Sequence, residues 1–311
     1  MSLLRPQHYL PTGLYWDIAV TLLHASRRLG YLPRLRTPRS LNEYILSQKL
    51  HFKSDMKLAR TVTDKIMFKE WLVQHGFADL VVPTAAILRD TEEARAWSAT
   101  GRFVVKPTHS SGKALLLAEH KHHRLSEAQL VMLAGWLKED YYLHSREINY
   151  RLLERAIIIE EMVCDRAGRI PNDYKLFCAA GEPFIIQVDY DRFSRPSRQL
   201  YDCSWNLLPY SQNIQKFPRD PQPRQRPTLL HTMLQRARDL SASFYFCRVD
   251  FYLVGEDSLK AGEITFFPGN GASRFTPSDG DFHAGLLVAK ALAEGEIRHA
   301  QSGRPQATEI T

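Results

Sequence analysis

The chain has 311 residues, of which 44% are hydrophobic and 24% are charged, and its formal net charge at pH 7 is +7. This composition is ordinary for a soluble globular protein and leaves room for one large domain or two smaller ones. No segment reaches the roughly 18 consecutive apolar residues that a membrane span needs. The mild, scattered excess of Lys and Arg indicates affinity for phosphates, of which nucleic acid would be only one kind.

The cysteines and the start of the chain bear on its compartment. Four cysteines are present, with neither CxxC spacing nor a His partner at metal-ligand spacing: Cys164, Cys178, Cys203 and Cys247. We interpret them as thiols in a reducing compartment. The first residues lack the charged region, long apolar core and small-residue cleavage site of a signal peptide. We therefore expect a cytoplasmic protein without a transmembrane segment.

The first half of the chain begins with helices and continues with strands. Helical spacing of apolar residues predicts helices over 14–30 and within 40–75, separated by the Pro-containing piece LPRLRTPRS. Strands are then predicted at 81–88, 103–107 and 114–120, with a helix over 126–139.

In the second half, strands pair as hairpins. The apolar run AIIIEEMV (156–163) is typical of a strand buried on both faces. Residues 173–193 predict two strands around a Gly turn, 217–227 a Pro-rich loop, and 228–242 a helix that leads into a hairpin. Because hairpins replace strict βαβ alternation, the pattern predicts an α+β fold with two lobes.

The last hairpin, RVDFYLVGEDSLKAGEITFFPGNG (248–271), carries charge at alternating positions. With its turn at 255–258, Asp250 faces Glu263 and Arg248 faces Thr265, all on one side of the ribbon. Two carboxylates placed in this way repel unless a cation lies between them, and such an oxygen pair suits Mg²⁺. The alternative is a pair neutralised by Arg248 or turned into solvent.

Four further pieces carry weaker signals. FVVKPTHSSG (103–112) ends a strand in a lysine and opens a Ser/Gly loop that suits a phosphate chain. IIIEEMV (157–163) suits an adenine hinge, and DYK (173–175) puts an acid and a lysine on one strand face. DYDRF (189–193) contains a D-x-D, which is the pattern of a metal-dependent glycosyltransferase that uses a sugar nucleotide.

Together these pieces resemble the ATP-grasp superfamily, and specifically its TupA-like branch, named for teichuronopeptide biosynthesis. The similarity runs from PRSLNEYILSQK (38–49) to SRFTP (273–277). The matching phrases are TDKIMFKEWLVQHG, FVVKPTHSSG, WLKEDYYLHSREINY, RAIIIEEMV, PNDYKLFCAAGEPFIIQVDYDRF, YDCSWNLLP and GEITFFPGNG. The resemblance implies two α+β lobes that grip ATP, preceded by a short, mainly helical segment.

The resemblance also implies roles for residues that hold the phosphates. Lys65 and Lys106 look like the two lysines that bind the α- and β-phosphates. Ser110, Ser111 and Gly112 look like the mobile loop that closes over them.

A second group of residues would hold the rest of the nucleotide. Glu160, Glu161 and Val163 look like the adenine hinge, and Asp173 looks like the ribose acid. Lys175 stands where the family places a second-lobe cation near the phosphates.

The hairpin residues would carry the chemistry. Arg248 looks like the arginine that steadies the acyl phosphate, and Asp250 and Glu263 look like the ligands of one or two Mg²⁺ ions. At the position of Thr265, better-known peptide ligases of the superfamily have Asn. The TupA-like branch has Thr there, as this chain does. Whether Thr265 or the nearby Asn270 contributes to metal binding stays open.

The resemblance divides the chain into four parts. We expect a helical N-terminal segment over 1–80, a small lobe with the phosphate loop and hinge over 81–165, a large lobe with the metal site over 166–295, and a disordered tail over 296–311.

The expected activity is ATP-dependent ligation of a carboxylate to an amine through an acyl phosphate, in the synthesis of a cell-surface polysaccharide or a related conjugate. Its substrates would be small molecules or saccharide-linked molecules, and no nucleic acid would bind. The rivals are the glycosyltransferase and a non-catalytic nucleotide-binding protein. Contact of the basic piece RRLGYLPRLR with a membrane or a partner also stays open.

Overall fold

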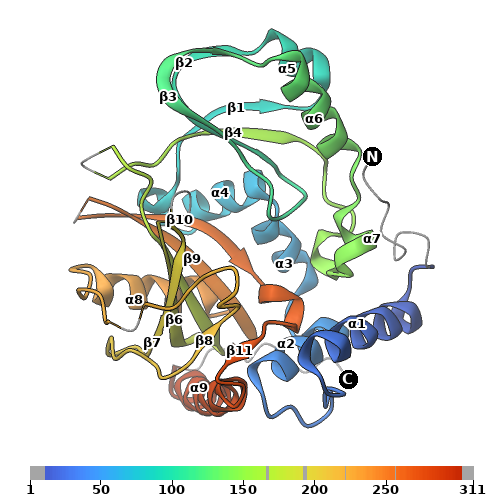
Figure 1. Cartoon of the computed structure of the whole chain (residues 1–311), viewed down its shortest axis with the longest axis vertical. Helices are drawn as coiled ribbons and strands as arrows, with labels where there is room; N and C mark the ends of the chain where they lie inside the picture. The colour runs from blue at the N-terminus through green and yellow to red at the C-terminus, as the bar shows by residue number, and fades with distance from the viewer. Residues whose placement is uncertain (1–10, 166–167, 192–194, 221, 256, 303–311) are drawn as a thin grey trace. The chain divides into compact units, whose positions relative to one another are not determined.

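The computed structural model describes residues 11–165, 168–191, 195–220, 222–255 and 257–302 (Figure 1). The chain folds into two compact units. We call Lys57–Ile170 the central unit, and Met1–Met56 together with Pro171–Thr311 the terminal unit. Both units mix helices with antiparallel sheets, so the predicted α+β class is confirmed.

The central unit is built on a four-stranded antiparallel sheet with the order β1-β4-β2-β3. Its strands are β1 (Thr84–Leu88), β2 (Ser98–Pro107), β3 (Leu115–Arg124) and β4 (Ile157–Glu161). Its helices are α3 (Met56–Thr63), α4 (Lys65–Gln74), α5 (Thr91–Ala96), α6 (Glu127–Lys138) and α7 (Tyr141–Ser145), with short 3₁₀ turns η2 (Ala78–Leu80) and η3 (Ile148–Tyr150).

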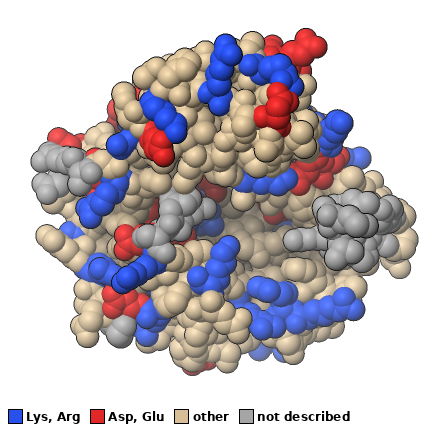
Figure 2. All heavy atoms as spheres, turned by 45° about the horizontal axis from the view of Figure 1, so that its top comes forward, with Lys and Arg blue, Asp and Glu red and all other residues tan. Residues whose placement is uncertain are grey.

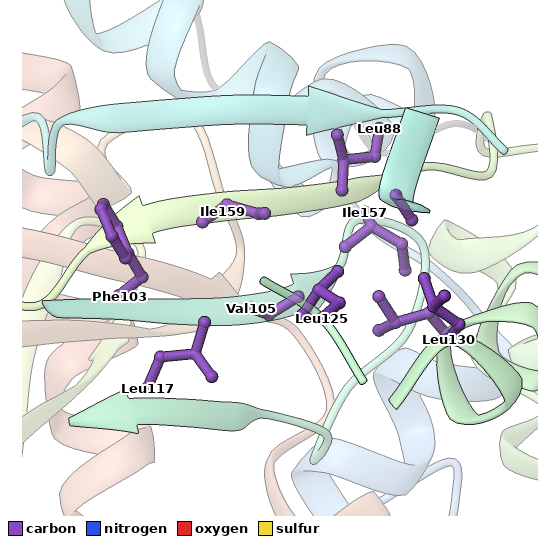
Figure 3. Packing of buried hydrophobic residues seen from close by; sticks show 10 residues of the cluster. Leu88, Phe103, Val105, Leu117, Leu125, Leu130, Ile157 and Ile159 are labelled. Carbon is purple, nitrogen blue, oxygen red and sulfur yellow. The ribbon is translucent and has the colours of Figure 1, made fainter. Parts of the chain in front are cut away.

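One hydrophobic core holds this sheet to α5 and α6 (Figure 3). Its labelled members are Leu88, Phe103, Val105, Leu117, Leu125, Leu130, Ile157 and Ile159. Ile157 and Ile159 of the central strand β4 are fully buried, and burial of each such side chain stabilises the unit by about 1.5–3 kcal/mol. The sequence prediction of a strand buried on both faces is confirmed.

The terminal unit carries a five-stranded antiparallel sheet with the order β10-β9-β5-β6-β7. Its strands are β5 (Asp173–Ala179), β6 (Glu182–Tyr190), β7 (Ser197–Tyr201), β9 (Phe246–Val254) and β10 (Ser258–Thr265), and the short β8 (Ser211–Gln212) pairs with β11 (Phe275–Thr276). Its helices are α1 (Leu14–Leu29), α2 (Leu41–Leu50), α8 (Leu230–Ser241), α9 (Gly280–Ser302) and the 3₁₀ turn η4 (Pro268–Gly271). Helices α8 and α9 pack against the strands.

The units and the four predicted parts of the chain do not share all borders. Residues up to Met56 belong to the same unit as the C-terminal part of the chain. Helices α3 and α4 belong to the central unit, with the four-stranded sheet. Helix α9 continues to Ser302, past residue 296 where the sequence indicated a tail, and 303–311 lie outside the described residues. Ala284, Val288 and Ala291 of α9 are buried, and beyond position 296 the helix is held by an ion pair between Arg298 and Glu182.

The register of the last hairpin is predicted correctly at its charged end and not near its turn. Asp250 faces Glu263, and Arg248 faces Thr265, as expected. Nearer the turn, Val254 faces Ser258, one residue away from the predicted pairing. The two registers meet at a bulge between Ala261 and Glu263, because a bulge adds one residue to one strand.

None of the helices in the described part of the chain is both long enough and apolar enough to cross a membrane.

Candidate functional site

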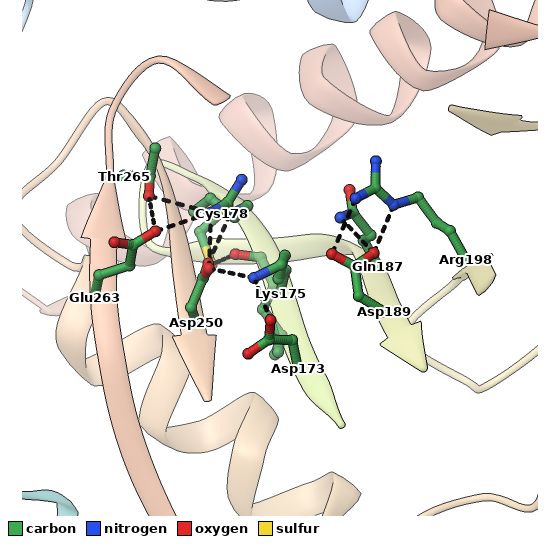
Figure 4. Close-up of polar contacts among 11 residues, drawn as sticks. Asp173, Lys175, Cys178, Gln187, Asp189, Arg198, Asp250, Glu263 and Thr265 are labelled. Atoms are coloured by element: carbon green, nitrogen blue, oxygen red, sulfur yellow. Dashed lines mark hydrogen bonds and ion pairs between the residues drawn. The ribbon is translucent and has the colours of Figure 1, made fainter. Parts of the chain in front are cut away.

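An arginine lies between the two carboxylates of the β9–β10 ribbon (Figure 4). The guanidinium of Arg248 donates to both oxygens of Asp250, at 2.6 Å from Nε and 2.7 Å from Nη2. The same Nη2 lies 3.3 Å from Oε1 of Glu263 and 3.3 Å from Oγ1 of Thr265. All four side chains therefore meet on one face, and the cation that separates the acids in this structure is Arg248.

A lysine from the next strand completes this cluster. Lys175 on β5 faces Asp250 across the sheet, and its Nζ donates to Oδ2 of Asp250 at 2.7 Å. The same Nζ lies 3.4 Å from Oδ2 of Asp173, so the expected shared face of Asp173 and Lys175 is confirmed. Because Asp250 is almost fully buried, both cations are needed to offset the cost of removing its charge from water.

The electrostatics of the cluster keep Asp250 and Lys175 charged. Burial by itself would raise the pKa of Asp250, but Arg248 and Lys175 outweigh burial and hold that pKa below its usual value. Burial by itself would lower the pKa of Lys175, but Asp250 and Asp173 outweigh it and raise that pKa. The cluster is therefore a preorganised set of fixed charges, which is the arrangement that stabilises charge developing on a substrate.

The D-x-D of the glycosyltransferase alternative is not arranged as a metal site. Asp189 is buried and accepts two hydrogen bonds from Arg198, at 2.5 Å and 2.9 Å. Strand β6 ends at Tyr190, and Asp191 is exposed with a left-handed φ of 46°. The two carboxylates consequently do not continue one strand face.

The donor set at the ribbon fits a magnesium ion that relies on non-protein ligands. Among the described residues, no group of three or more His, Cys, Asp or Glu side chains could hold a metal. Mg²⁺ is usually held by only one or two carboxylates, with waters and substrate phosphates as the other ligands. The side chain of Glu263 is 36% exposed, and that of Asp250 is 3% exposed. The residues present therefore fit such an ion through Asp250 and the more accessible Glu263.

Asn270 is already engaged by a lysine that the sequence analysis did not single out. Lys49 on α2 donates from Nζ to Oδ1 of Asn270 at 2.5 Å. An ammonium competes with a metal ion for the same amide oxygen. Of the two candidates that the sequence left open, Thr265 is the one beside the carboxylates, 3.2 Å from Oε1 of Glu263.

In the central unit, one buried glutamate is shared by two lysines. Glu160 on β4 pairs through Oε2 with Lys106 at 2.7 Å and through Oε1 with Lys69 at 2.6 Å. Lys69 also donates to the carbonyl of Val82 at 2.6 Å and to Oγ1 of Thr84 at 2.9 Å. Burial would raise the pKa of Glu160, but the two lysines outweigh it and lower that pKa to about 2.

Lys69 is the functional candidate that sequence reasoning missed in this unit. It stands four residues after Lys65 in TDKIMFKEW, which places both lysines on one helix face. Asp64 caps α4 by accepting from the backbone N–H groups of Ile66 and Met67, so the first turn that carries Lys65 is held in place. The spacing of four was the available signal.

The Ser/Gly loop is tied to Lys65 within the same unit. Lys65 donates from Nζ to the carbonyl of Ser110 at 2.8 Å, and the Ser110 hydroxyl donates to Glu139 at 2.9 Å. Gly112 is exposed and has a φ of 76°, a conformation that glycine adopts without strain. Lys65 and the predicted loop of Ser110, Ser111 and Gly112 therefore lie together.

The predicted hinge begins at the end of β4, which contains Glu160 and Glu161, and continues to Val163. The backbone N–H of Glu161 donates to the carbonyl of Pro83, and that of Met162 donates to the carbonyl of Arg102. Glu161 is exposed and Val163 is partly exposed. The side chain of Glu160, by contrast, is buried and pairs with Lys69 and Lys106.

A family model described as TupA-like ATPgrasp matches residues 45–288, well over half of the chain. The chain belongs to the TupA-like ATP-grasp family. The resemblance to the TupA-like branch that the sequence indicated is therefore confirmed.

Solved structures of ATP-grasp ligases are also similar to the TupA-like chain. The D-alanine–D-alanine ligase from Bacillus anthracis is 14% identical, with a TM-score of 0.40 over 78% of this chain and 69% of that one. The L-amino acid ligase from Bacillus licheniformis is 13% identical, with a TM-score of 0.45 over 89% and 56%. ATP-grasp ligase PsnB, complexed with a minimal precursor, is 12% identical, with a TM-score of 0.37 over 77% and 62%. The chain thus spans about three fifths of the PsnB chain. No curated protein matches the chain.

Proposed function

We propose that the protein joins a carboxylate to an amine at the expense of ATP. A substrate carboxylate oxygen attacks the γ-phosphorus, ADP leaves, and an acyl phosphate forms. An amine then attacks the acyl carbon and expels phosphate, which leaves an amide. The observation that carries the proposal is the charged cluster of Arg248, Asp250, Glu263 and Lys175 in a chain of the TupA-like ATP-grasp family.

The cluster suits phosphoryl transfer because this reaction depends mostly on positioning and charge neutralisation. Arg248 is fixed by Asp250 through two hydrogen bonds, so its guanidinium can face developing negative charge without rearranging. The substrate carboxylate is already an anion, and the first step therefore needs no strong protein base. One or two Mg²⁺ ions, held by Asp250 and Glu263, would neutralise part of the triphosphate charge.

The phosphates of ATP are assigned to lysines of the central unit. We assign the α- and β-phosphates to Lys65 and Lys106, and closure over them to Ser110, Ser111 and Gly112. Lys65 already contacts the loop through the carbonyl of Ser110. The Ser/Gly loop can therefore respond to whatever binds the lysine.

The remaining nucleotide contacts are assigned by motif position. We assign adenine to the backbone of Glu161 and Val163 and ribose to Asp173. For Glu160 the contacts support a different role, because its carboxylate holds Lys106 by an ion pair of 2.7 Å. Glu160 would then act by positioning Lys106 at the hinge.

The family name points to the substrates. We propose a uronic-acid unit or amino acid of a cell-surface polysaccharide or its precursor as one substrate, with both substrates small molecules or saccharide-linked, and the reaction in the cytoplasm.

Hydroxylamine tests the reaction without knowledge of the natural amine, because it converts an acyl phosphate into a hydroxamate. Candidate uronic and amino acids are offered with ATP, Mg²⁺ and hydroxylamine, and hydroxamate and ADP are measured. We expect one acid class to give both products in equal amounts. Turnover of a sugar nucleotide, or ATP binding with no acid-dependent ADP, would overturn the proposal in favour of a glycosyltransferase or a non-catalytic binder.

A matched pair of variants ties that activity to the ribbon. Glu263→Gln should abolish hydroxamate formation, whereas Glu294→Gln removes an exposed carboxylate on α9 of the same unit and should leave it unchanged. Equal activity in both variants would exclude the metal role of Glu263.

A further inference from the structure

The first helix carries large apolar side chains that stay exposed within the described part of the chain. Only Thr21 and Ala25 of α1 are buried. Large apolar side chains are exposed instead, with exposed fractions of 76% for Tyr15, 55% for Leu23 and 72% for Leu32 just after the helix. The exposed apolar residues of this part of the chain are Leu14, Tyr15, Trp16, Leu23 and Leu32.

Arginines gather beside these residues. The exposed ones between residues 11 and 40 are Arg27, Arg28, Arg34, Arg36 and Arg39. Among the described residues, none of these five side chains forms an ion pair with a carboxylate. Asp17 is the single acidic residue between positions 11 and 40. Figure 2 shows Lys and Arg side chains gathered at the lower right, on the side where Figure 1 draws α1.

The fold holds the arginine-bearing segment in place while leaving its side chains outside. Glu43 on α2 accepts from the backbone N–H groups of Arg34 at 2.9 Å and Arg39 at 2.8 Å. The end of α1 is fixed as well, because Arg274 donates to the carbonyl of Arg28 at 2.8 Å. The exposed charges therefore belong to an ordered surface. We call the five apolar residues and the five arginines the α1 surface.

The spacing puts two of the apolar side chains and one arginine on one stripe of the helix. Trp16, Leu23 and Arg27 are separated by seven and four residues, which brings them to the same face. Leucine and tryptophan lower their free energy by leaving water, and unpaired guanidinium groups bind phosphate. A bilayer with anionic phospholipid satisfies both, whereas nucleic acid offers no apolar surface to the leucines.

We propose that the α1 surface docks the chain on a bilayer that contains anionic phospholipid. Helix α1 lies along the interface with Tyr15, Trp16 and Leu23 among the acyl chains and the arginines at the headgroup phosphates. Its 16 residues give a length of about 24 Å, shorter than the hydrocarbon core of about 30 Å, and its end is doubly charged. An orientation along the surface follows from both facts.

Co-sedimentation of the full chain with vesicles tests this proposal. Vesicles of phosphatidylcholine alone are compared with vesicles that also contain phosphatidylglycerol, at low and at high salt. We expect binding to the anionic vesicles that weakens as salt rises, because the arginine contribution is screened. Failure to bind anionic vesicles, or equal binding to both kinds, would overturn the proposal.

Two variants and two controls assign the binding to this surface. The double variant Arg27→Gln/Arg28→Gln should lower the partition coefficient about thirtyfold, and Leu23→Ala should lower it about tenfold. The controls Arg124→Gln/Arg226→Gln and Leu286→Ala change exposed residues elsewhere and should bind as the unaltered chain does.

The variants also separate a lipid from other partners. Unaltered vesicle binding by both test variants would overturn the proposal. So would binding to duplex DNA, or self-association in gel filtration, that is lost in the arginine variant while vesicle binding is absent. The surface would then be a nucleic-acid or protein interface.

Discussion

The guanidinium of Arg248 serves Asp250 and Glu263 unequally. It makes two hydrogen bonds to Asp250 at 2.6 Å and 2.7 Å and only one contact, of 3.3 Å, to Glu263. Asp250 also receives Lys175, while the side chain of Glu263 stays partly exposed. Asp250 is thus bound into the fold, whereas Glu263 is available to a ligand.

Neutral variants of the two acids should therefore differ in stability and agree in activity. Asp250→Asn leaves two buried cations with one partner fewer and should lower the free energy of unfolding by about 3–5 kcal/mol. Glu263→Gln should lower it by less than about 1 kcal/mol, because the contact is long and partly solvated. Both should abolish acid-dependent ADP formation. Denaturant unfolding and ADP release measure the two effects, and equal stability losses would contradict this assignment.

Glu160 makes a second prediction, about pH. Its pKa is lowered to about 2 in the folded chain, because Lys106 and Lys69 outweigh the opposing effect of burial. A lowered folded-state pKa stabilises the fold above the unfolded value of about 4.5, and this contribution disappears as pH falls toward 2. The contribution is on the order of 3 kcal/mol at most, since burial of Lys69, which lowers the pKa of that lysine, opposes it.

The variant Glu160→Gln lacks this titration. The stability gap between it and the unaltered chain should be constant above about pH 5 and should narrow as pH falls from about 4.5 toward 2. Urea unfolding at a series of pH values measures the gap. A gap that widens on acidification would show that Glu160 is not held ionised by the lysines.

Residue-level reading of the sequence succeeded where the signal was local. The alternation of Arg248 and Asp250 with Glu263 and Thr265 was enough to place four side chains together, as the structure has them. Which carboxylate Arg248 binds more closely could not be predicted. A strand pattern shows the face on which a side chain lies but not the partner with which it pairs. Lys69 was missed for the same reason.

At the scale of elements, the β9–β10 ribbon shows how a turn and a site can have different registers. The pairing changes by one residue between Ala261 and Glu263. Gly262 stands at this bulge, where an added Cβ would lie 3.0 Å from the ring of Tyr252. Without the bulge, the turn would bring a different residue opposite Asp250. A sequence pattern does not contain the position of a bulge, so the correct prediction at the site depended on the choice of turn.

Two helical glycines give a third prediction: replacement by alanine should lower stability at one position and raise it at the other. Gly285 on α9 lies so close to the segment before α2 that an added Cβ would be 2.0 Å from the carbonyl oxygen of Arg39. Gly135 on α6 is exposed and has nothing within 4 Å of that position. Gly285→Ala should destabilise the terminal unit by several kcal/mol, and Gly135→Ala should stabilise the central unit by about 0.5–1 kcal/mol.

Thermal unfolding of both variants checks this pair. A stable Gly285→Ala variant would mean that α9 does not approach the chain at Arg39 as closely as the structure has it. A loss of stability in Gly135→Ala would mean that α6 is not a regular exposed helix at this point.

At the scale of the whole molecule, the terminal unit is assembled from both ends of the chain. Asn42 on α2 donates from its backbone N–H to Oδ1 of Asp281 on α9 at 3.0 Å, and from its side chain to the carbonyl of Ser273 at 2.8 Å. These partners are more than 200 positions apart in the sequence. Local periodicity predicted α1, α2 and the hairpins. It did not predict α9, nor the grouping of the two ends of the chain, because that grouping depends on contacts between distant positions.

In the described part of the chain, two sets of charged residues differ in that one is paired and the other unpaired. The acidic and basic residues of the ribbon are paired with one another, whereas the arginines after α1 are exposed and unpaired among the described residues. We propose the first set for chemistry on a phosphate and the second for docking on a bilayer. The net charge of +7 alone distinguished neither.

The origin of one oxygen atom tests the ligase account most directly. The carboxylate found by the hydroxylamine screen is labelled with ¹⁸O in both oxygens and converted with ATP and the amine, and the phosphate released is weighed by mass spectrometry. Attack of the carboxylate on the γ-phosphorus predicts one ¹⁸O in each phosphate, together with ADP and an amide that keeps the other label. Unlabelled phosphate, or release of AMP and pyrophosphate, would contradict an acyl phosphate at this site.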